Sequence, residues 1–146
     1  MNIAIARTDA ERQACFDLRF EVFVDEQGVT PESEIDAADQ EAIHLLMTEE
    51  DGPIGTLRIL YEAGDARIGR VCLRQSARGK GLGAALMQAA LAAIAEGPAV
   101  TAIRLSAQVP VLGFYEGLGF TAYGPVYDDE GIPHRSMKRD ATGAAG

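Results

Sequence analysis

The sequence predicts a single α/β domain of the α+β type, with a mixed, mostly antiparallel central sheet flanked by helices. Three observations support this fold class. The chain has 146 residues and is 47% hydrophobic, so one domain can bury a core without disulfides. Three consecutive strand-like segments are joined by short turns, as in an antiparallel meander. The third segment leads through a glycine-rich turn into a helix, so helices are expected to cover the sheet.

The chain begins with a predicted strand and a predicted helix. Within residues 1–7, Ile3 and Ile5 recur with the period of two of a strand, and Thr8 and Glu11 have the spacing of a capping box. The helix then carries an apolar stripe, which predicts a side packed into the core, until Gly28 ends the pattern. The stripe consists of Phe16, Leu18, Phe20, Val22 and Phe23.

An acidic segment without periodicity follows the helix. Residues 25–39 are polar and contain Pro31, so we expect a surface loop there. Such a loop would attract a cationic substrate, and a solvated run of charges is an equally good interpretation. Its acidic side chains include Glu26, Glu32, Glu34, Asp36 and Asp39.

The meander is expected over residues 42–48, 54–61 and 67–73. Each of these segments is rich in apolar and β-branched side chains, and turn-forming residues separate them. In the third strand, alternation with a period of two predicts that Ile68 and Cys72 share one face.

The stretch after the third strand predicts an anion-binding turn. Apolar residues recur at helical spacing until Gly97, so a helix is expected to begin near Gly81. The first backbone N–H groups of a helix lack intrahelical partners and lie at the positive end of the macrodipole, so glycines in front of them let a phosphate approach the backbone. The turn consists of Arg78, Gly79, Lys80, Gly81, Leu82 and Gly83.

Spacing distinguishes this turn from two other glycine-rich turns. A Walker loop needs Ser or Thr after its Gly-Lys pair, whereas Gly81 follows Lys80. The Rossmann pattern is met only loosely by Gly79, Gly81 and Ala84, and it needs an acidic residue about 20 positions later, where this sequence has none. A solvated basic turn that binds no ligand remains the plain alternative.

A strand and a short helix are predicted next. Residues 99–107 alternate, and the strand is expected to pair parallel to residues 67–73 or to splay from them. Pro110 suits the first turn of a helix over residues 111–118, and Gly119 suits its C-terminal cap.

A hairpin is expected to close the sheet. Residues 121–127 and 134–138 flank an acidic turn that contains a glycine. Residues 141–146 are small and lack any pattern, so we expect a disordered tail after a domain of residues 1–140.

The composition narrows the function. A formal net charge of −9 argues against nucleic-acid binding, so the basic turn points to a small polyanionic ligand. Cys15 and Cys72 lie far apart and outside any CxxC pattern, which predicts neither a disulfide framework nor a metal site and fits a reducing cytoplasm. We expect no signal peptide, and we expect no membrane span because every apolar run is shorter than the roughly 18 residues that one requires.

The order of elements and two motifs resemble the GCN5-related N-acetyltransferases (GNAT). The acyl-CoA loop of that family has Arg or Gln, two residues, Gly, one residue, then Gly or Ala, and Arg78, Gly81 and Gly83 fill this pattern. The family also has an Asn or similar residue before a Phe-Tyr…Gly-Phe unit. Gln108 and residues 114–120 match it, with Gln where most of the family has Asn.

The resemblance is closest to the ElaA/YjcF-like branch and spans nearly the whole chain. The matching segments are residues 20–27, 42–44, 68–71 and 131–134. The resemblance implies a GNAT-type fold and an acyltransferase that moves an acetyl group from acetyl-CoA directly to a primary amine of a small molecule or peptide. It implies no metal, and it leaves open whether the chain forms a homodimer.

The same resemblance implies which residues bind acetyl-CoA. The exposed edge of the third meander strand would pair with the pantetheine amides, and the glycine turn would take the pyrophosphate. The residues implied are Val71, Cys72, Leu73, Arg78, Gly79, Lys80, Gly81, Leu82, Gly83, Gln108, Phe114 and Tyr115.

The chemistry needs a proton donor for the CoA thiolate and a base for the amine. The family resemblance implies Tyr115 as the donor, against the alternative of a packed core tyrosine. His44 and His134 are candidates for the base because imidazole titrates near neutral pH, although each also fits a structural role. Glu26, Asp36 or Asp39 could act instead, directly or through water. Cys72 as an acyl-carrying nucleophile is less favoured, since no histidine lies beside it in the sequence.

Two rival functions remain. A catalytically silent acyl-CoA-binding sensor or interaction domain would keep the cofactor slot without turnover. A nucleotide-binding module would use the same turn, but the failed Walker and Rossmann spacings argue against it.

Overall fold

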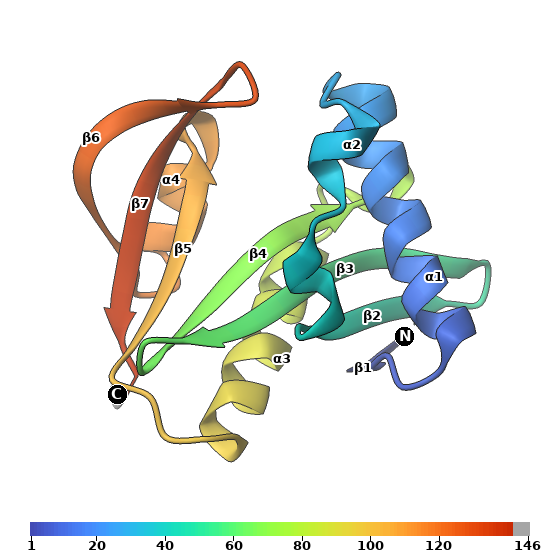
Figure 1. Ribbon diagram of the computed structural model, residues 1–146. Helices are drawn as coiled ribbons and strands as arrows, with labels where there is room; N and C mark the ends of the chain where they lie inside the picture. The colour runs from blue at the N-terminus through green and yellow to red at the C-terminus, as the bar shows by residue number, and fades with distance from the viewer. Residues whose placement is uncertain (142–146) are drawn as a thin grey trace.

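Over residues 1–141, which the structure describes, this computed structural model forms a seven-stranded sheet in the order β1-β2-β3-β4-β5-β7-β6 (Figure 1). The strands are β1 (Asn2–Ile5), β2 (Ile43–Glu49), β3 (Gly52–Glu62), β4 (Asp65–Leu73), β5 (Ala102–Gln108), β6 (Thr121–Asp129) and β7 (Ile132–Asp140). The α-helices are α1 (Asp9–Arg19), α2 (Pro31–Glu34), α3 (Leu82–Glu96) and α4 (Leu112–Glu116). The chain also forms a π-helix, η1 (Phe20–Glu26), and the 3₁₀ helices η2 (Ala37–Gln40), η3 (Gln75–Ala77) and η4 (Val109–Val111).

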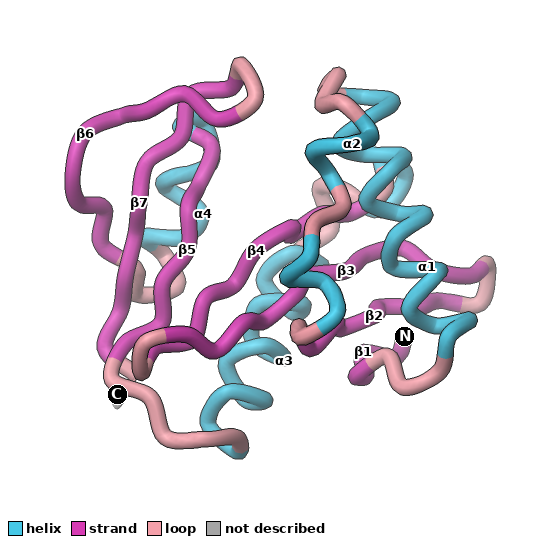
Figure 2. The backbone as a smooth tube through the Cα atoms, in the orientation of Figure 1, coloured by secondary structure: helices cyan, strands magenta, loops and turns pink. Residues whose placement is uncertain are grey.

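Neighbouring strands are antiparallel except β4 and β5, which are parallel. Within the described residues, two pairs join these strands, Ala66 with Ile103 and Arg67 with Arg104, and beyond them the strands diverge (Figure 2). The Asp65 carboxylate strengthens this junction by accepting a hydrogen bond from Arg104 Nε at 2.6 Å. The prediction of a strand that pairs parallel or splays is confirmed, because β5 does both.

Different helices cover the two faces of the sheet, as Figure 1 shows. Leu86 and Met87 of α3 are fully buried with Ile59 and Ile68 of the sheet, whereas Cys15 of α1 belongs to a separate apolar cluster. A fully buried aliphatic side chain of this size contributes roughly 1.5–3 kcal/mol. The predicted mixed, mostly antiparallel sheet with flanking helices is therefore confirmed.

The first helix begins as predicted but changes from an α-helix to a π-helix along its length. Thr8 Oγ1 accepts a hydrogen bond from the Glu11 N–H at 3.1 Å, and Glu11 Oε1 accepts one from the Thr8 N–H at 3.0 Å, so the capping box is confirmed. From Phe20 the winding widens to a π-helix, in which the Gln27 N–H donates to the Val22 carbonyl. Phe20 lies where the winding changes and is 45% exposed, so the prediction that it packs in the core is wrong.

A β-bulge interrupts the alternation of β4. Arg70 and Val71 together lie opposite Leu57 of β3, and Arg70 has a φ of +53°. The extra residue turns the side chains that follow it to the other face of the sheet. Ile68 packs toward α3 and Cys72 packs toward α1. The prediction that these two residues share a face is therefore wrong.

The elements on either side of the cleft, α3, α4 and the final hairpin, agree with the predictions. α3 begins directly after Gly81, whose φ is +76°, and Gly119 after α4 also takes a left-handed conformation. The β6–β7 hairpin forms with a tighter turn than expected. The Ala141 N–H donates to the Thr101 carbonyl at 3.2 Å, and the rest of the predicted tail, residues 142–146, lies outside the described residues. None of the described helices is long and apolar enough to cross a membrane.

Candidate active site

A cleft of about 940 Å³ opens where β4 and β5 diverge. It is lined by β4 from Arg67 onward, by part of β3, by the glycine turn, by the ends of β5 and α4, and by η1, α2 and the β6–β7 turn. Beyond Arg67, no described residue of β5 pairs with this edge of β4. Most backbone N–H and C=O groups along that edge are therefore available to a ligand that runs beside the strand, whereas the Leu73 carbonyl already accepts a hydrogen bond from Arg78 Nε.

The structure brings most of the predicted ligand-binding residues to this cleft. All the residues predicted to contact acetyl-CoA line it except Lys80. Of the residues predicted to be catalytic, Tyr115 and His134 line the cleft, whereas His44 and Glu26 do not.

The glycine turn leaves the N-terminus of α3 open. Gly79 and Gly81 have φ values of +78° and +76°, and no heavy atom beyond their chain neighbours lies within 4 Å of where a Cβ would be on either. A Cβ on Gly83 would lie 3.4 Å from the ring of Phe114, so this glycine allows α4 to pack closely on α3. The free N–H groups at the start of the 15-residue α3 thus face the cleft without a covering side chain.

Two ion pairs tie η1 to the segment between β4 and α3, one at Arg74 and one at Arg78 of the glycine turn. Arg74 Nη2 lies 2.9 Å from Glu21 Oε1, and Arg78 Nη2 lies 2.8 Å from Glu26 Oε1. Glu21 and Glu26 are five residues apart, and a π-helix brings residues at this spacing to the same side. Arg78 Nε also donates to the Leu73 carbonyl at 3.0 Å. Glu26 is therefore engaged beside the turn and does not point into the cleft lining.

Tyr115 presents a protonated phenol to the cleft. It is 8% exposed, and burial raises the pKa of its hydroxyl to about 12. The rings of Phe114 and Phe120 contact it edge-on, with centroids at 4.9 and 6.2 Å. Its hydroxyl has no hydrogen-bond partner among residues 1–141. A phenol that stays neutral at pH 7 and has no internal acceptor can donate to a group that enters the cleft.

His134 has one ring nitrogen fixed by the backbone. Its Nδ1 lies 2.8 Å from the Ile132 carbonyl, which can only accept, so Nδ1 carries the hydrogen. The neutral ring then keeps its lone pair on Nε2, as a base requires. The ring stacks on Tyr127 at 6.1 Å, and the Tyr127 hydroxyl contacts that of Ser106.

His44 lies outside the cleft, beneath α1. It is buried, its ring lies nearly perpendicular to that of Phe16 with the centroids 5.4 Å apart, and its Nε2 donates to the Asp39 carbonyl at 3.0 Å. The structure does not bring it near Tyr115 or the glycine turn. Cys72 also has its side chain on the α1 side, and burial raises the pKa of this thiol to about 12. A thiol with so high a pKa is a poor nucleophile.

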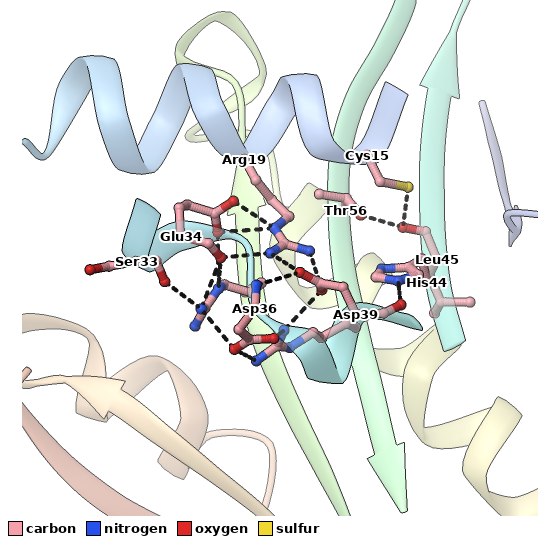
Figure 3. A network of polar contacts seen from close by, with 11 residues as sticks. Cys15, Arg19, Ser33, Glu34, Asp36, Asp39, His44, Leu45 and Thr56 are labelled. Carbon is pink, nitrogen blue, oxygen red and sulfur yellow. Dashed lines mark hydrogen bonds and ion pairs between the residues drawn. The ribbon is translucent and has the colours of Figure 1, made fainter. Parts of the chain in front are cut away.

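The acidic segment after η1 is folded around buried arginines. α2 and η2 replace the expected surface loop, and Glu34 and Asp39 are almost completely buried. Figure 3 shows Arg19 between them: its Nε lies 3.0 Å from Glu34 Oε2, and its Nη1 lies 2.7 Å from Asp39 Oδ1. The prediction that these carboxylates form a solvated surface is wrong, because arginines distant in the sequence neutralise them.

Two more arginines extend this ionic network toward the cleft. Arg58 Nη1 lies 2.8 Å from Asp36 Oδ1 and 2.9 Å from Asp39 Oδ1. Arg70 Nε lies 2.9 Å from Glu34 Oε2, which anchors the bulge of β4 to α2. Sequence reasoning missed Arg58, although a charged residue inside the apolar strand of residues 54–61 was an available signal. The ionic network consists of Arg19, Glu34, Asp36, Asp39, Arg58 and Arg70.

Gln108 connects the two sides of the cleft. It is the last residue of β5, and its Nε2 donates to Gln27 Oε1, directly after η1, at 2.9 Å. The Gln108 amide therefore reaches across the opening.

Comparison with known proteins agrees with this architecture. The sequence model of the acetyltransferase (GNAT) domain matches residues 6–141. The Bacillus subtilis protein named uncharacterized N-acetyltransferase YjcF is 34% identical over 96% of this chain and 100% of its own length. The crystal structure of an acyl-CoA N-acyltransferase from Pseudomonas aeruginosa has a TM-score of 0.85 and 35% identity, covering 94% of this chain and 98% of that one. Escherichia coli ElaA has a TM-score of 0.86 and 28% identity, covering 95% and 99%.

These similarities extend over nearly the entire length of each protein, and they include both the glycine turn and the strands that flank the cleft. Enzymes of this family transfer an acyl group from acyl-CoA to an amine. The chain belongs to the GNAT acetyltransferase family, in its ElaA/YjcF-like branch.

Proposed function

We propose that this protein transfers an acetyl group from acetyl-CoA directly to the primary amine of a small molecule or peptide. One observation carries the proposal: an open helix N-terminus, an unpaired strand edge and a free phenol line the same cleft. These three features match the pyrophosphate, the pantetheine amides and the leaving thiolate of an acyl-CoA, in that order.

In this proposal the backbone does most of the binding of acetyl-CoA. The N–H groups that follow Gly79 and Gly81 hold the pyrophosphate, and the edge of β4 at Val71 and Leu73 pairs with the pantetheine amides. Gln108 exchanges its bond to Gln27 for a contact with the acyl-CoA. Lys80 contributes only a screened charge, because it lies outside the lining.

The proposed transfer needs one side chain to accept a proton and another to donate one. The amine nitrogen attacks the thioester carbonyl, a C–N bond forms, and the C–S bond breaks. His134 Nε2 takes the proton that the amine loses, directly or through one water, and the Tyr115 hydroxyl gives a proton to the sulfur. His44 and Glu26 have no part in this scheme, because one lies beneath α1 and the other is paired with Arg78.

The experiment is a screen of amines and peptides with detection of the thiol released from acetyl-CoA. Acceptor-dependent thiol release that Tyr115→Phe suppresses would support the proposal. Acetyl-CoA binding by calorimetry without release for any acceptor would instead indicate an acyl-CoA-binding sensor. Competition by ATP against CoA would indicate a nucleotide-binding module. We also propose a cytoplasmic location, since both cysteines are free thiols, and light scattering of the same preparation measures whether a homodimer forms.

A further inference from the structure

The part of the cleft that faces α2 has a floor built around a glycine. Gly69 of β4 pairs with Arg58 of β3, so the two residues share the face on which α2 lies. Arg67 is two residues before Gly69 and points to the same side. Beyond its chain neighbours, one heavy atom lies within 4 Å of the place where a Cβ on Gly69 would be: Arg58 Nε, at 3.8 Å. The floor therefore has an open space beside a guanidinium.

The nitrogen next to this space lacks a partner. Arg58 is 7% exposed, and its Nε is buried without a hydrogen-bond acceptor among residues 1–141. A buried guanidinium N–H without an acceptor is uncommon and costly, because the donor gives up its bond to water. This residue lines the cleft, as do Gly69, Arg67 and Arg70. The arrangement favours a ligand with an anionic oxygen over Gly69.

Charge balance indicates how much negative charge fits there. Three arginines and three carboxylates make up the ionic network, so it adds no net charge. Arg67 is outside it: its side chain is 50% exposed, and its partner Glu62 is just as exposed, so that pair is weak. Because this weakly paired arginine is the one cation added to a balanced network, the floor matches a singly charged carboxylate better than a dianionic phosphate. The acidic side chains at the rim, Asp129 and Glu130, suit the amine end of the same molecule.

We propose that the acceptor is an amine that also carries a carboxylate, and that this carboxylate lies over Gly69 against Arg67. The inference rests on the proposed function and narrows its substrate class. It reverses the expectation of a cationic substrate, because the acidic segment that suggested one is neutralised inside the protein. Residues of the β6–β7 turn and of α2 both line the cleft, and Figure 1 shows these two elements facing each other across a gap between the ribbons. In this proposal the acceptor enters between them.

The test compares matched acceptors. Glycine, β-alanine, 4-aminobutanoate and glycylglycine are each assayed with acetyl-CoA beside their carboxamides and the amines that lack the carboxyl group. We expect at least one acid to have a kcat/KM tenfold or more above its amide and its amine. Arg67→Gln should reduce this advantage to threefold or less through KM with kcat unchanged, and Arg67→Glu should reverse it. Glu62→Gln, the matched control, should keep the preference, because it removes only the exposed partner of Arg67.

A binding measurement separates this inference from the proposed function. Calorimetry with the CoA-loaded protein measures the affinity for the N-acetyl derivatives of the same acids and of their amides. Tighter binding of the acids, weakened fivefold or more by Arg67→Gln, supports the inference even if no acceptor is turned over, in which case the proposed function fails alone. Equal binding of acids and amides, or turnover of polyamines in preference to acids, overturns the inference and leaves the proposed function intact.

Discussion

Replacing Asp39 with Asn removes one charge from the ionic network while hardly changing the side-chain volume. Asp39 Oδ1 accepts from Arg19 Nη1 at 2.7 Å and from Arg58 Nη1 at 2.9 Å, and Arg19 is only 1% exposed. The Asn variant would leave a buried guanidinium without its second carboxylate. Breaking a buried pair in this way costs about 3–5 kcal/mol. Since each kcal/mol shifts the Tm of a domain of this size by about 2–4 °C, we expect a fall of roughly 6–20 °C.

Urea unfolding followed by circular dichroism measures this loss, and Asp36→Asn is the control. The Asp36 side chain is 41% exposed and pairs with Arg58 at 2.8 Å, so its neutralisation should cost at most about 1 kcal/mol. Both variants should keep the m-value of the wild type, because the surface exposed on unfolding is unchanged. Equal losses for the two variants would refute the reasoning, since burial would then not decide the cost.

Asp39→Asn should also change how the free energy of unfolding depends on pH. Burial alone would raise the pKa of Asp39, but the hydrogen bonds from Arg19 and Arg58 outweigh it and hold the pKa well below its usual range. The stabilisation is therefore complete above the unfolded pKa of about 4 and is lost as the pH falls toward the folded pKa. The wild-type free energy of unfolding should decline below about pH 4, and the Asp39→Asn variant should decline less steeply.

Three further predictions concern the cleft. Tyr115→Phe should leave CoA affinity nearly unchanged and lower the single-turnover rate by roughly 10²–10⁴-fold, and an unchanged rate would exclude the phenol as the acid. Gly81→Val should abolish CoA binding in calorimetry, because a side chain would cover the open N–H groups, whereas Lys80→Ala should cost about 1 kcal/mol or less. Gly55→Ala should weaken CoA binding and lower the free energy of unfolding, the latter by about 1–3 kcal/mol in urea unfolding, since its Cβ would lie 2.6 Å from Leu73 Cδ2, and normal values for both would show that Leu73 adapts freely.

Sequence patterns predicted correctly those structural features that depend on interactions between residues close together in the chain. The capping box at Thr8 and the glycine turn before α3 depend on neighbours within a few residues, and both are present. The bulge at Arg70 could not be predicted, because a non-glycine residue with a φ of +53° is held there by Glu34, 36 residues earlier in the chain. The carboxylates of the acidic segment were misread for the same reason, since Arg58 reaches Asp36 and Asp39 only after the chain has folded.

The same distinction between local and distant interactions applies to the candidate site. The glycine turn and Tyr115 belong to short motifs, so their place in the cleft followed from the sequence. For His44, strand alternation could indicate a face of the sheet, but it could not indicate that α1 covers that face. Gly69 makes no turn or cap that a local sequence pattern would reveal. The open space above it matters only because Arg58 of β3 is paired with it, and that pairing is not visible in the sequence.

The divergence of β4 from β5 leaves two strand edges bare in the interior of a sheet rather than at its ends. Edges of this kind readily pair with a strand from another chain, so this part of the sheet favours aggregation. An acyl-CoA that runs along β4 would occupy the edge of that strand and prevent such pairing. At a hundredfold excess over Kd, such a ligand would also add about 2.7 kcal/mol to the free energy of unfolding. Both the resistance of this protein to aggregation and its melting temperature should therefore rise with the acyl-CoA concentration around it.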